Sequence, residues 1–143
     1  MRDDPRRRDP AAYPWSLEMP TRFADMDVNF HLNNVAIARF FEETRIRFSR
    51  ELITADAAVE RPRYLVAHVA IDYLGEGRYP QPVLMTLGVG VMGRSSFRNQ
   101  MAMFQDGACL ALSDTVLVHR GDAGPATLPD ALRSRLEAFA LAG

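Results

Sequence analysis

One long amphipathic segment, followed mainly by long strand-like segments, is the feature that most restricts what this chain can fold into. Between residues 34 and 52 the apolar positions mostly recur three, four or seven places apart, and Arg39, Glu43 and Arg47 follow at intervals of four. This spacing is typical of a helix with one buried and one charged face. Asn33 or Asn34 suits the helix N-cap, because its side-chain oxygen accepts a hydrogen bond from a free amide of the first turn. The apolar positions are Val35, Ile37, Ala38, Phe41, Phe48 and Leu52.

Strand-like segments make up most of the remaining chain. Residues 63–74, 83–92, 96–105 and 108–119 are rich in valine, leucine, methionine and phenylalanine, and turns that contain glycine separate them. Residues 15–23 alternate loosely and predict a first strand, which Pro20 places at an edge or a bulge. A loop is expected over 121–129. A short helix follows over 131–141, opened by Pro129 and Asp130.

This order predicts an α+β fold in which a five-stranded, mostly antiparallel sheet wraps around one long central helix, with a short C-terminal helix. Such an arrangement is the hotdog plan. We expect residues 15–143 to form this single domain. Residues 1–14 are charged and rich in proline, and they predict a flexible tail. One helix leaves much strand surface to cover, so a homodimer or a tetramer of dimers is expected.

Composition excludes several classes of protein. The chain has 143 residues with a net charge of −1, and all 17 basic residues are arginine, which excludes a lysine Schiff base or a P-loop lysine. Near-neutral charge argues against a nucleic-acid partner. The single cysteine, Cys109, excludes an intramolecular disulfide framework and a zinc site built from cysteines. With no apolar run of roughly 18 residues and no leader pattern, we expect a cytoplasmic protein without membrane insertion.

The polar stretch before the helix carries the chemistry. Asp25, Asp27, Asn29, His31 and Asn33 alternate along it, directly ahead of the expected helix N-terminus. A helix N-terminus offers free backbone amides and a positive dipole end, both of which favour a developing oxyanion. A carboxylate beside it can attack a carbonyl or activate water, and an imidazole can transfer a proton near neutral pH. The stretch therefore predicts a site for attack on a polarised carbonyl.

Two other interpretations of the stretch are weaker. Asp25 and Asn33 are also residues that cap turns and helices, and for Asp25 this structural role is favoured. A calcium loop would need glycine at its sixth position and glutamate at its twelfth, where this chain has Phe30 and Ala36. A transition metal on Asp25, Asp27 and His31 would need a further ligand from elsewhere. No metal site is expected.

The sequence from Asp27 to Asn34 resembles the D-x-N-x-H-x-N-N signature of hotdog-fold thioesterases. It is similar to the acyl-ACP thioesterases and to the 4-hydroxybenzoyl-CoA thioesterase superfamily. The following RFFEETR at 39–45 resembles the helix motif of that superfamily, and IDY at 71–73, GRSSF at 93–97 and LPDAL at 128–132 resemble later segments in the same order. The resemblance spans roughly residues 16–135. It implies a dimeric hydrolase of acyl thioesters that uses no metal or organic cofactor.

The resemblance also implies roles for individual residues. Asp27 matches the catalytic carboxylate, which attacks the thioester carbonyl or activates water, and Asn34 matches the position whose backbone amide polarises that carbonyl. Asn29 and His31 match residues that orient substrate and handle protons. Glu76 aligns less securely with a general base of the acyl-ACP enzymes, and the cysteine that follows it there is Gly77 here.

Substrate-binding residues are expected at two further places. Asn33 lies within the signature, and the turn at Arg94, Ser95 and Ser96 offers a guanidinium and donors that suit the phosphates of CoA. A simple turn between two strands is an equal alternative for that segment. Glu42 faces either the helix surface or a neighbouring subunit's pocket. His68 and His119 fit strand positions, and the methionine-rich strands fit the core, with some methionines lining an acyl tunnel.

The function expected from the sequence is hydrolysis of an acyl-CoA to free acid and CoA, with a place in fatty acid metabolism. An acyl-ACP thioesterase is the first alternative. A hotdog enoyl-CoA hydratase is less favoured, because its D-x-N-P-x-H pattern has one more residue between aspartate and histidine and a proline after the asparagine. A module that binds acyl-CoA without turnover has no need of a carboxylate beside the carbonyl.

Overall fold

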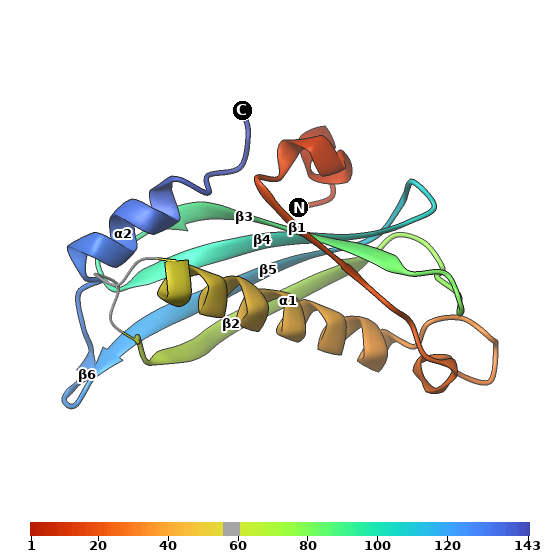
Figure 1. The fold of residues 1–143 in the computed structure, drawn as a ribbon, viewed down its shortest axis with the longest axis horizontal. Coiled ribbons are helices and arrows are strands. Elements are labelled where there is room, and N and C mark those ends of the chain that lie inside the picture. Colours follow the sequence, from red (N-terminus) through yellow and green to blue (C-terminus); the bar gives the residue numbers. More distant parts are fainter. Residues whose placement is uncertain (56–60) are drawn as a thin grey trace.

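The computed structural model describes residues 1–55 and 61–143 as one curved antiparallel sheet with a long helix packed against its inner face (Figure 1). The strand order is β1-β3-β4-β5-β2, and β6 pairs with β5. The strands are β1 (Trp15–Met19), β2 (Tyr64–Tyr73), β3 (Val83–Met92), β4 (Ser96–Gln105), β5 (Ala108–Gly121) and β6 (Gly124–Pro125). The helices are α1 (Asn34–Ala55), α2 (Asp130–Glu137) and three 3-10 turns, η1 (Pro5–Arg8), η2 (Pro10–Ala12) and η3 (Phe23–Asp25).

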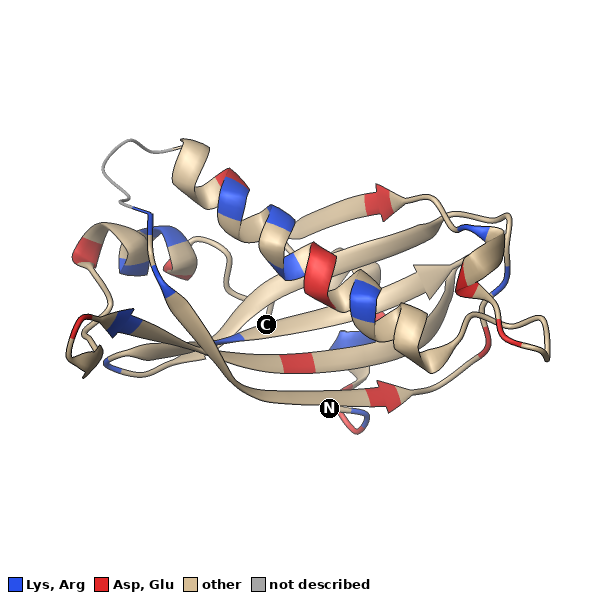
Figure 2. Cartoon of the chain, turned by 90° about the horizontal axis from the view of Figure 1, so that it is seen from below, with Lys and Arg blue, Asp and Glu red and all other residues tan. Residues whose placement is uncertain are grey.

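The main core lies between α1 and the sheet. Most of the predicted apolar face of α1 is buried and meets methionine, leucine and valine side chains of β3 and β4, but Val35 at its start is 60% exposed. Burying a large apolar side chain contributes roughly 1.5–3 kcal/mol, so this contact holds α1 firmly on the sheet. The charged residues of α1 lie on its outward side (Figure 2). The core residues include Ile37, Phe41, Phe48, Leu52, Met85, Leu87, Met101 and Met103.

These features confirm the expected hotdog fold. Besides shifts of one to three residues at the ends of α1, β2 and β5, three differences from the expected elements stand out. β1 ends at Met19, directly before Pro20, because proline has no amide to donate to β3. α2 ends at Glu137 instead of 141, and Ala140 forms a bridge with Val89 of β3. The segment expected as a loop holds the short strand β6, which pairs with Arg120 and Gly121.

The expectation of a solvated tail at residues 1–14 is wrong. This segment packs against the outer face of the sheet, the face away from α1, where Tyr13 joins Phe104, Ala102 and Leu112 in a second apolar cluster. Arg7 is only 1% exposed. Its guanidinium can be buried because it forms an ion pair with Asp114 and donates to two backbone carbonyls on that face. A charged residue in a proline-rich stretch is therefore part of the folded domain.

Both faces of β2 are less covered than the rest of the sheet. β2 ends the strand order and has β5 as its neighbour. Four of its large apolar residues are exposed, by 39% to 49%, whereas Tyr64 and Ile71 are partly buried. The four exposed residues are Leu65, Val66, Val69 and Tyr73.

Within the described residues, no helix is long and apolar enough to span a bilayer.

Candidate active site

The signature residues form a tight loop between η3 and α1. The Asp27 amide donates to the His31 carbonyl at 3.0 Å, and the Phe30 amide donates to the Asp27 carbonyl at 3.0 Å. Phe30 adopts the left-handed conformation, with φ of 59°. The bridge between Met26 and Leu32 closes the loop at its base. Backbone hydrogen bonds therefore fix the position from which the Asp27 side chain projects.

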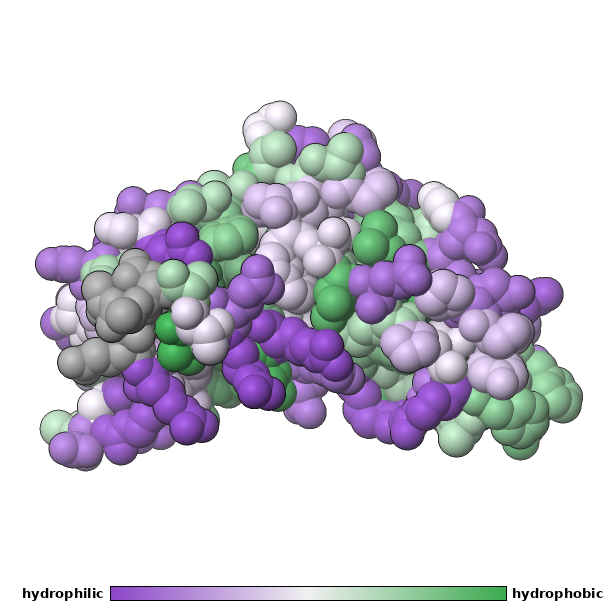
Figure 3. Space-filling model, in the orientation of Figure 1, coloured by the Kyte–Doolittle hydropathy of each residue, from purple (hydrophilic) through white to green (hydrophobic). Residues whose placement is uncertain are grey.

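The Asp27 carboxylate is half-buried and only partly engaged. Its Oδ1 accepts the Asn29 amide at 2.9 Å. Its Oδ2 has no hydrogen-bond partner among residues 1–55 and 61–143. Exposed apolar side chains lie beside it, with Val28 91% exposed and Phe30 66% exposed. Hydrophobic residues accordingly gather at this end of the molecule (Figure 3). One carboxylate oxygen remains available to a reacting group in partly apolar surroundings.

The start of α1 lies directly behind this loop. Asn33 is the N-cap, because its Oδ1 accepts the Val35 amide at 2.8 Å and its carbonyl accepts the Ile37 amide at 2.9 Å. The Asn34 amide has no hydrogen-bond partner in the described part of the chain. It is the kind of free donor that a helix N-terminus presents to an anion. Tyr73 of β2 donates its hydroxyl to the Asn34 carbonyl at 3.4 Å.

The structure brings His31 and Glu76 together from segments far apart in the sequence. The His31 Nε2 lies 3.1 Å from the Glu76 Oε2. Glu76 sits in the loop between β2 and β3, where the Leu32 amide donates to the Gly77 carbonyl at 2.7 Å. A carboxylate at this distance orients an imidazole for proton transfer. The two residues thus form one polar pair next to the Asp27 loop.

Gly77 occupies a position with little room for a side chain. A Cβ at Gly77 would lie 2.7 Å from side-chain atoms of both Leu32 and Leu110. The close approach of the two loops therefore depends on glycine here, where the acyl-ACP enzymes have a cysteine. Cys109 lies on β5, and burial raises the pKa of its thiol. A raised pKa reduces the thiolate fraction, which makes this cysteine a poor nucleophile.

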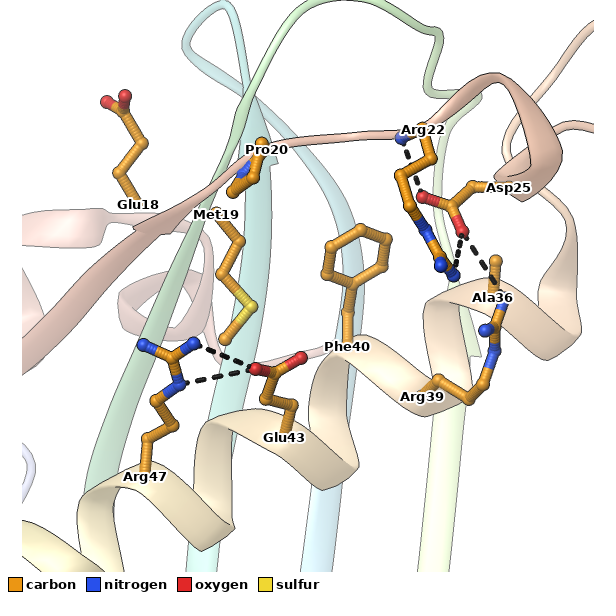
Figure 4. Close-up of a pocket in the computed structure, with 10 residues that line it drawn as sticks. All are labelled: Glu18, Met19, Pro20, Arg22, Asp25, Ala36, Arg39, Phe40, Glu43 and Arg47. Carbon is orange, nitrogen blue, oxygen red and sulfur yellow. Dashed lines mark hydrogen bonds and ion pairs between the residues drawn. The ribbon is translucent and has the colours of Figure 1, made fainter.

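Asp25 has a structural role, which is the role that the sequence analysis favoured for an aspartate at this position. It is 3% exposed, its Oδ2 accepts the Arg22 amide at 2.8 Å, and its Oδ1 lies 3.3 Å from both the Arg22 and the Arg39 guanidinium. Its carbonyl accepts the Asn33 amide at 2.8 Å, which ties η3 to the start of α1. Asp25 also closes one end of a cleft of about 390 Å³ between β1 and α1 (Figure 4). Met19 and Phe40 line that cleft between the charged side chains.

Arg94, Ser95 and Ser96 lie at the opposite end of the sheet from Asp27. Ser96 pairs with Val118, which pairs with Leu65 near the start of β2, whereas Asp27 lies near its end. Backbone carbonyls of the turn accept several hydrogen bonds there. One of them comes from the Arg133 guanidinium, which donates to the Gly93 carbonyl at 2.6 Å. One chain alone therefore does not join this turn to the Asp27 loop.

The remaining candidates lie outside the Asp27 loop. Glu42 is exposed and lies 3.7 Å from Arg45, and burial lowers the pKa of that guanidinium. His119 has its Nδ1 3.1 Å from the Ala126 carbonyl, as a strand histidine bound to the backbone does. His68 is exposed on β2. Among the described residues, no group of three or more histidine, cysteine, aspartate or glutamate side chains could hold a metal ion.

Gln105 is a contributor to this region that sequence reasoning missed. It ends β4, and its side-chain amide makes three hydrogen bonds to the backbone of the loop that carries Glu76. A glutamine before a turn has no distinctive pattern in the sequence, so nothing there could have identified it. Beside it lies a surface depression of about 490 Å³. The residues that line this depression are Glu76, Arg78, Gln81, Gln105, Asp106, Ala108 and Leu110.

Comparison with known proteins defines the class. The model of the thioesterase-like superfamily matches residues 21–136. A solved structure of a Pseudomonas aeruginosa protein is 28% identical, with a TM-score of 0.80, and the match covers 94% of this chain and 97% of that chain. A Thermus thermophilus thioesterase, solved with coenzyme A and zinc, is 28% identical with a TM-score of 0.77, covering 89% of this chain and 94% of that chain. No curated protein matches the sequence.

Fold and family together give the assignment. The match to the thioesterase-like superfamily and the likeness to a solved thioesterase of the same fold identify the chain as a thioester hydrolase. The family model covers most of the chain, so the chain belongs to the thioesterase-like superfamily.

Proposed function

We propose that the protein hydrolyses acyl-CoA thioesters, with Asp27 as the catalytic carboxylate. The single observation that carries this proposal is the position of Asp27, whose free Oδ2 lies on a fixed loop directly ahead of the unpaired Asn34 amide. A carbonyl placed between them would meet an attacking group on one side and a donor for its oxygen on the other. Oxyanion donors of this kind contribute roughly 2.7–4 kcal/mol of transition-state stabilisation.

Two balanced routes use the same residues. In the first, an Asp27 oxygen attacks the thioester carbon, the C–S bond breaks and CoA departs as the thiolate. The acyl group is then joined to Asp27 as an anhydride, which water hydrolyses. In the second, Asp27 takes a proton from water as that water attacks the carbon directly. In either route the His31–Glu76 pair orients substrate or water and passes a proton to the leaving sulfur. The backbone amide of Asn29 stabilises the loop through its hydrogen bond to Asp27. Single turnover in ¹⁸O water separates the routes, because only the anhydride route can leave the label in Asp27.

The proposed form is a homodimer, either alone or as half of a tetramer. The exposed apolar residues of the edge strand β2 support pairing with β2 of a second copy. Antiparallel pairing about a two-fold axis would bring the Arg94–Ser96 turn of the second copy to the same end as Asp27. That turn would then be available to the CoA phosphates. The coenzyme A in the Thermus thermophilus relative supports CoA as the carrier.

The experiment is free-thiol release from a panel of acyl-CoAs that runs from short to long and from aliphatic to aromatic. Wild type is compared with Asp27→Asn, which removes the nucleophilic charge and keeps the side-chain volume. We expect turnover by wild type and a loss of about 10³-fold in the variant, or about 4 kcal/mol of transition-state stabilisation. The profile across the panel names the preferred acyl group.

Asp122→Asn is the matched control, because Asp122 is fully exposed and, among the residues that the structure describes, pairs only with Arg63 at the far end of the sheet. It should retain wild-type turnover. Activity that survives in Asp27→Asn would overturn the assignment of Asp27. No thiol release from any acyl-CoA would overturn the CoA assignment, and the panel is then repeated with acyl carrier protein and with enoyl-CoA hydration.

A further inference from the structure

The loop between β2 and β3 connects the candidate site to the sheet. Its first part is held by β5, since the Leu74 and Gly75 amides both donate to the Leu110 carbonyl. Its middle part contacts the signature loop twice, through Glu76 with His31 and through the Gly77 carbonyl with Leu32. The position of Glu76 therefore depends on what fixes the rest of this loop.

Gln105 fixes the second half of the loop. Its Oε1 accepts the Arg78 amide at 2.9 Å, and its Nε2 donates to the Arg78 carbonyl at 2.7 Å and to the Gln81 carbonyl at 2.9 Å. The side chain is 8% exposed, so these backbone groups have little water to replace a lost partner. Both ends of one amide are used, and few other side chains can donate and accept in this way.

The same carbonyl also contacts the segment between β1 and η3. Thr21, 7% exposed and four residues ahead of Asp25, donates its hydroxyl to the Gln81 carbonyl at 2.9 Å. The loop between β2 and β3 therefore contacts the signature loop at Gly77 and Glu76, and it contacts the segment just ahead of that loop at Gln81. Gln105, on a strand in the middle of the sheet, holds this assembly from one side.

We propose that Gln105 is a positioning residue that holds Glu76 against His31. It does not touch the reacting atoms. It acts through the backbone of residues 78–81, and without it the loop loses the contacts that set the place of Glu76. This inference rests on the proposed function for its catalytic consequence, while the geometry it predicts can be measured in the absence of substrate.

The test is the NMR signal of the His31 ring. The chain has three histidines, so the ring signals are few, and His31→Gln identifies the signal of interest. Glu76→Gln gives the displacement that follows loss of the carboxylate. Gln105→Met removes all three hydrogen bonds at similar volume. We expect it to displace the His31 signal in the same direction as Glu76→Gln and to leave His68 and His119 in place.

Gln100→Met is the matched control, since Gln100 lies on the same strand and makes no hydrogen bond with its side chain in the described residues. It should leave all three signals unchanged. Gln105→Glu keeps the acceptor for the Arg78 amide and loses both donors, and it decides the question if Gln105→Met does not fold. A His31 signal that stays at its wild-type position in a folded Gln105 variant would overturn the inference.

Turnover provides a separate measurement. With the preferred acyl-CoA, Gln105→Met should lower kcat/KM about tenfold, and in a Glu76→Gln background it should cause little further loss, because the two residues act as one unit. Losses that multiply in the double variant would contradict action through Glu76. If no acyl-CoA is hydrolysed, the proposed function fails, and the NMR result alone decides the role of Gln105.

Discussion

At the scale of single residues, Arg7 contributes most clearly to the contact between the N-terminal segment and the outer face of the sheet. Its guanidinium lies 2.8 Å from the Asp114 carboxylate and 3.0 Å from the Tyr13 hydroxyl, and it also donates to the carbonyls of Met101 and Ser113 at 3.1 Å. Burial opposes its charge, but Tyr13 and Asp114 together hold its pKa above the usual value. Arg7 supplies the buried polar part of the attachment of the N-terminal segment to the outer face, and Tyr13 supplies the apolar part.

We expect Arg7→Met to lower the free energy of unfolding by about 3 kcal/mol. The reason is that Asp114, 7% exposed, would keep its charge, and within the described part of the chain Arg98, at 3.3 Å, would be its one remaining ion-pair partner. Urea unfolding followed by circular dichroism measures the change. Arg6→Met is the control and should leave the free energy of unfolding nearly unchanged, because Arg6 forms an exposed pair with Asp4. Equal effects of the two substitutions would contradict a special role for Arg7.

At the scale of elements, the site depends on how closely two loops approach. The signature loop and the loop between β2 and β3 meet where the Leu32 amide reaches the Gly77 carbonyl. Neither loop belongs to a regular element, so their contact is set by backbone hydrogen bonds and by the absence of a side chain at Gly77. The helix N-terminus and the sheet serve as the fixed supports on either side.

We expect Gly77→Ala to cost about 1–3 kcal/mol of stability and to reduce turnover, because the new Cβ would lie 2.7 Å from the side-chain ends of the buried Leu32 and Leu110 and would force both to repack. Gly75→Ala is the matched control, since its nearest neighbour would lie at 3.5 Å, an ordinary contact. Thermal unfolding and thiol release on both variants make the comparison. The prediction fails if the two alanines behave alike.

At the scale of the whole molecule, the uncovered strand β2 is where we propose that two copies of the chain associate. Val69 lies in the middle of β2 and is 49% exposed. A dimer that continues the sheet from one copy to the next would cover it and would place two Asp27 loops and two Arg94 turns in one molecule.

We expect wild type to be at least a dimer by light scattering and Val69→Asp to shift it toward monomer with a loss of turnover, because the substitution would bury a charge at the interface. Val91→Asp is the control. Val91, on β3, is 78% exposed, and the same change there should leave mass and turnover unaltered. A monomeric wild type with full activity would show that one chain holds a complete site.

Much of this architecture follows from local pattern. The apolar spacing of α1, the Asn33 cap and the bounds of β3 and β4 were predictable, because each depends on residues close together in the sequence. The burial of Arg7 was not, since it depends on Asp114, more than a hundred residues away. The same reason hid Gln105 and the distance of Arg94 from Asp27. The sequence alone indicated a role for Glu76 near His31 only because the resemblance aligned Glu76 with a general base.

Both ends of the chain lie together on the outer face. The Ala142 amide donates to the Ala12 carbonyl at 2.9 Å, and the Arg6 guanidinium reaches the Ala142 carbonyl at 3.4 Å. In Figure 1 the termini stand on the opposite side of the sheet from α1. A linker attached at Gly143 would therefore lead away from the Asp27 loop. The protein can be tethered to a bead, an electrode or a neighbouring enzyme by its C-terminus with the reacting end turned toward the solution.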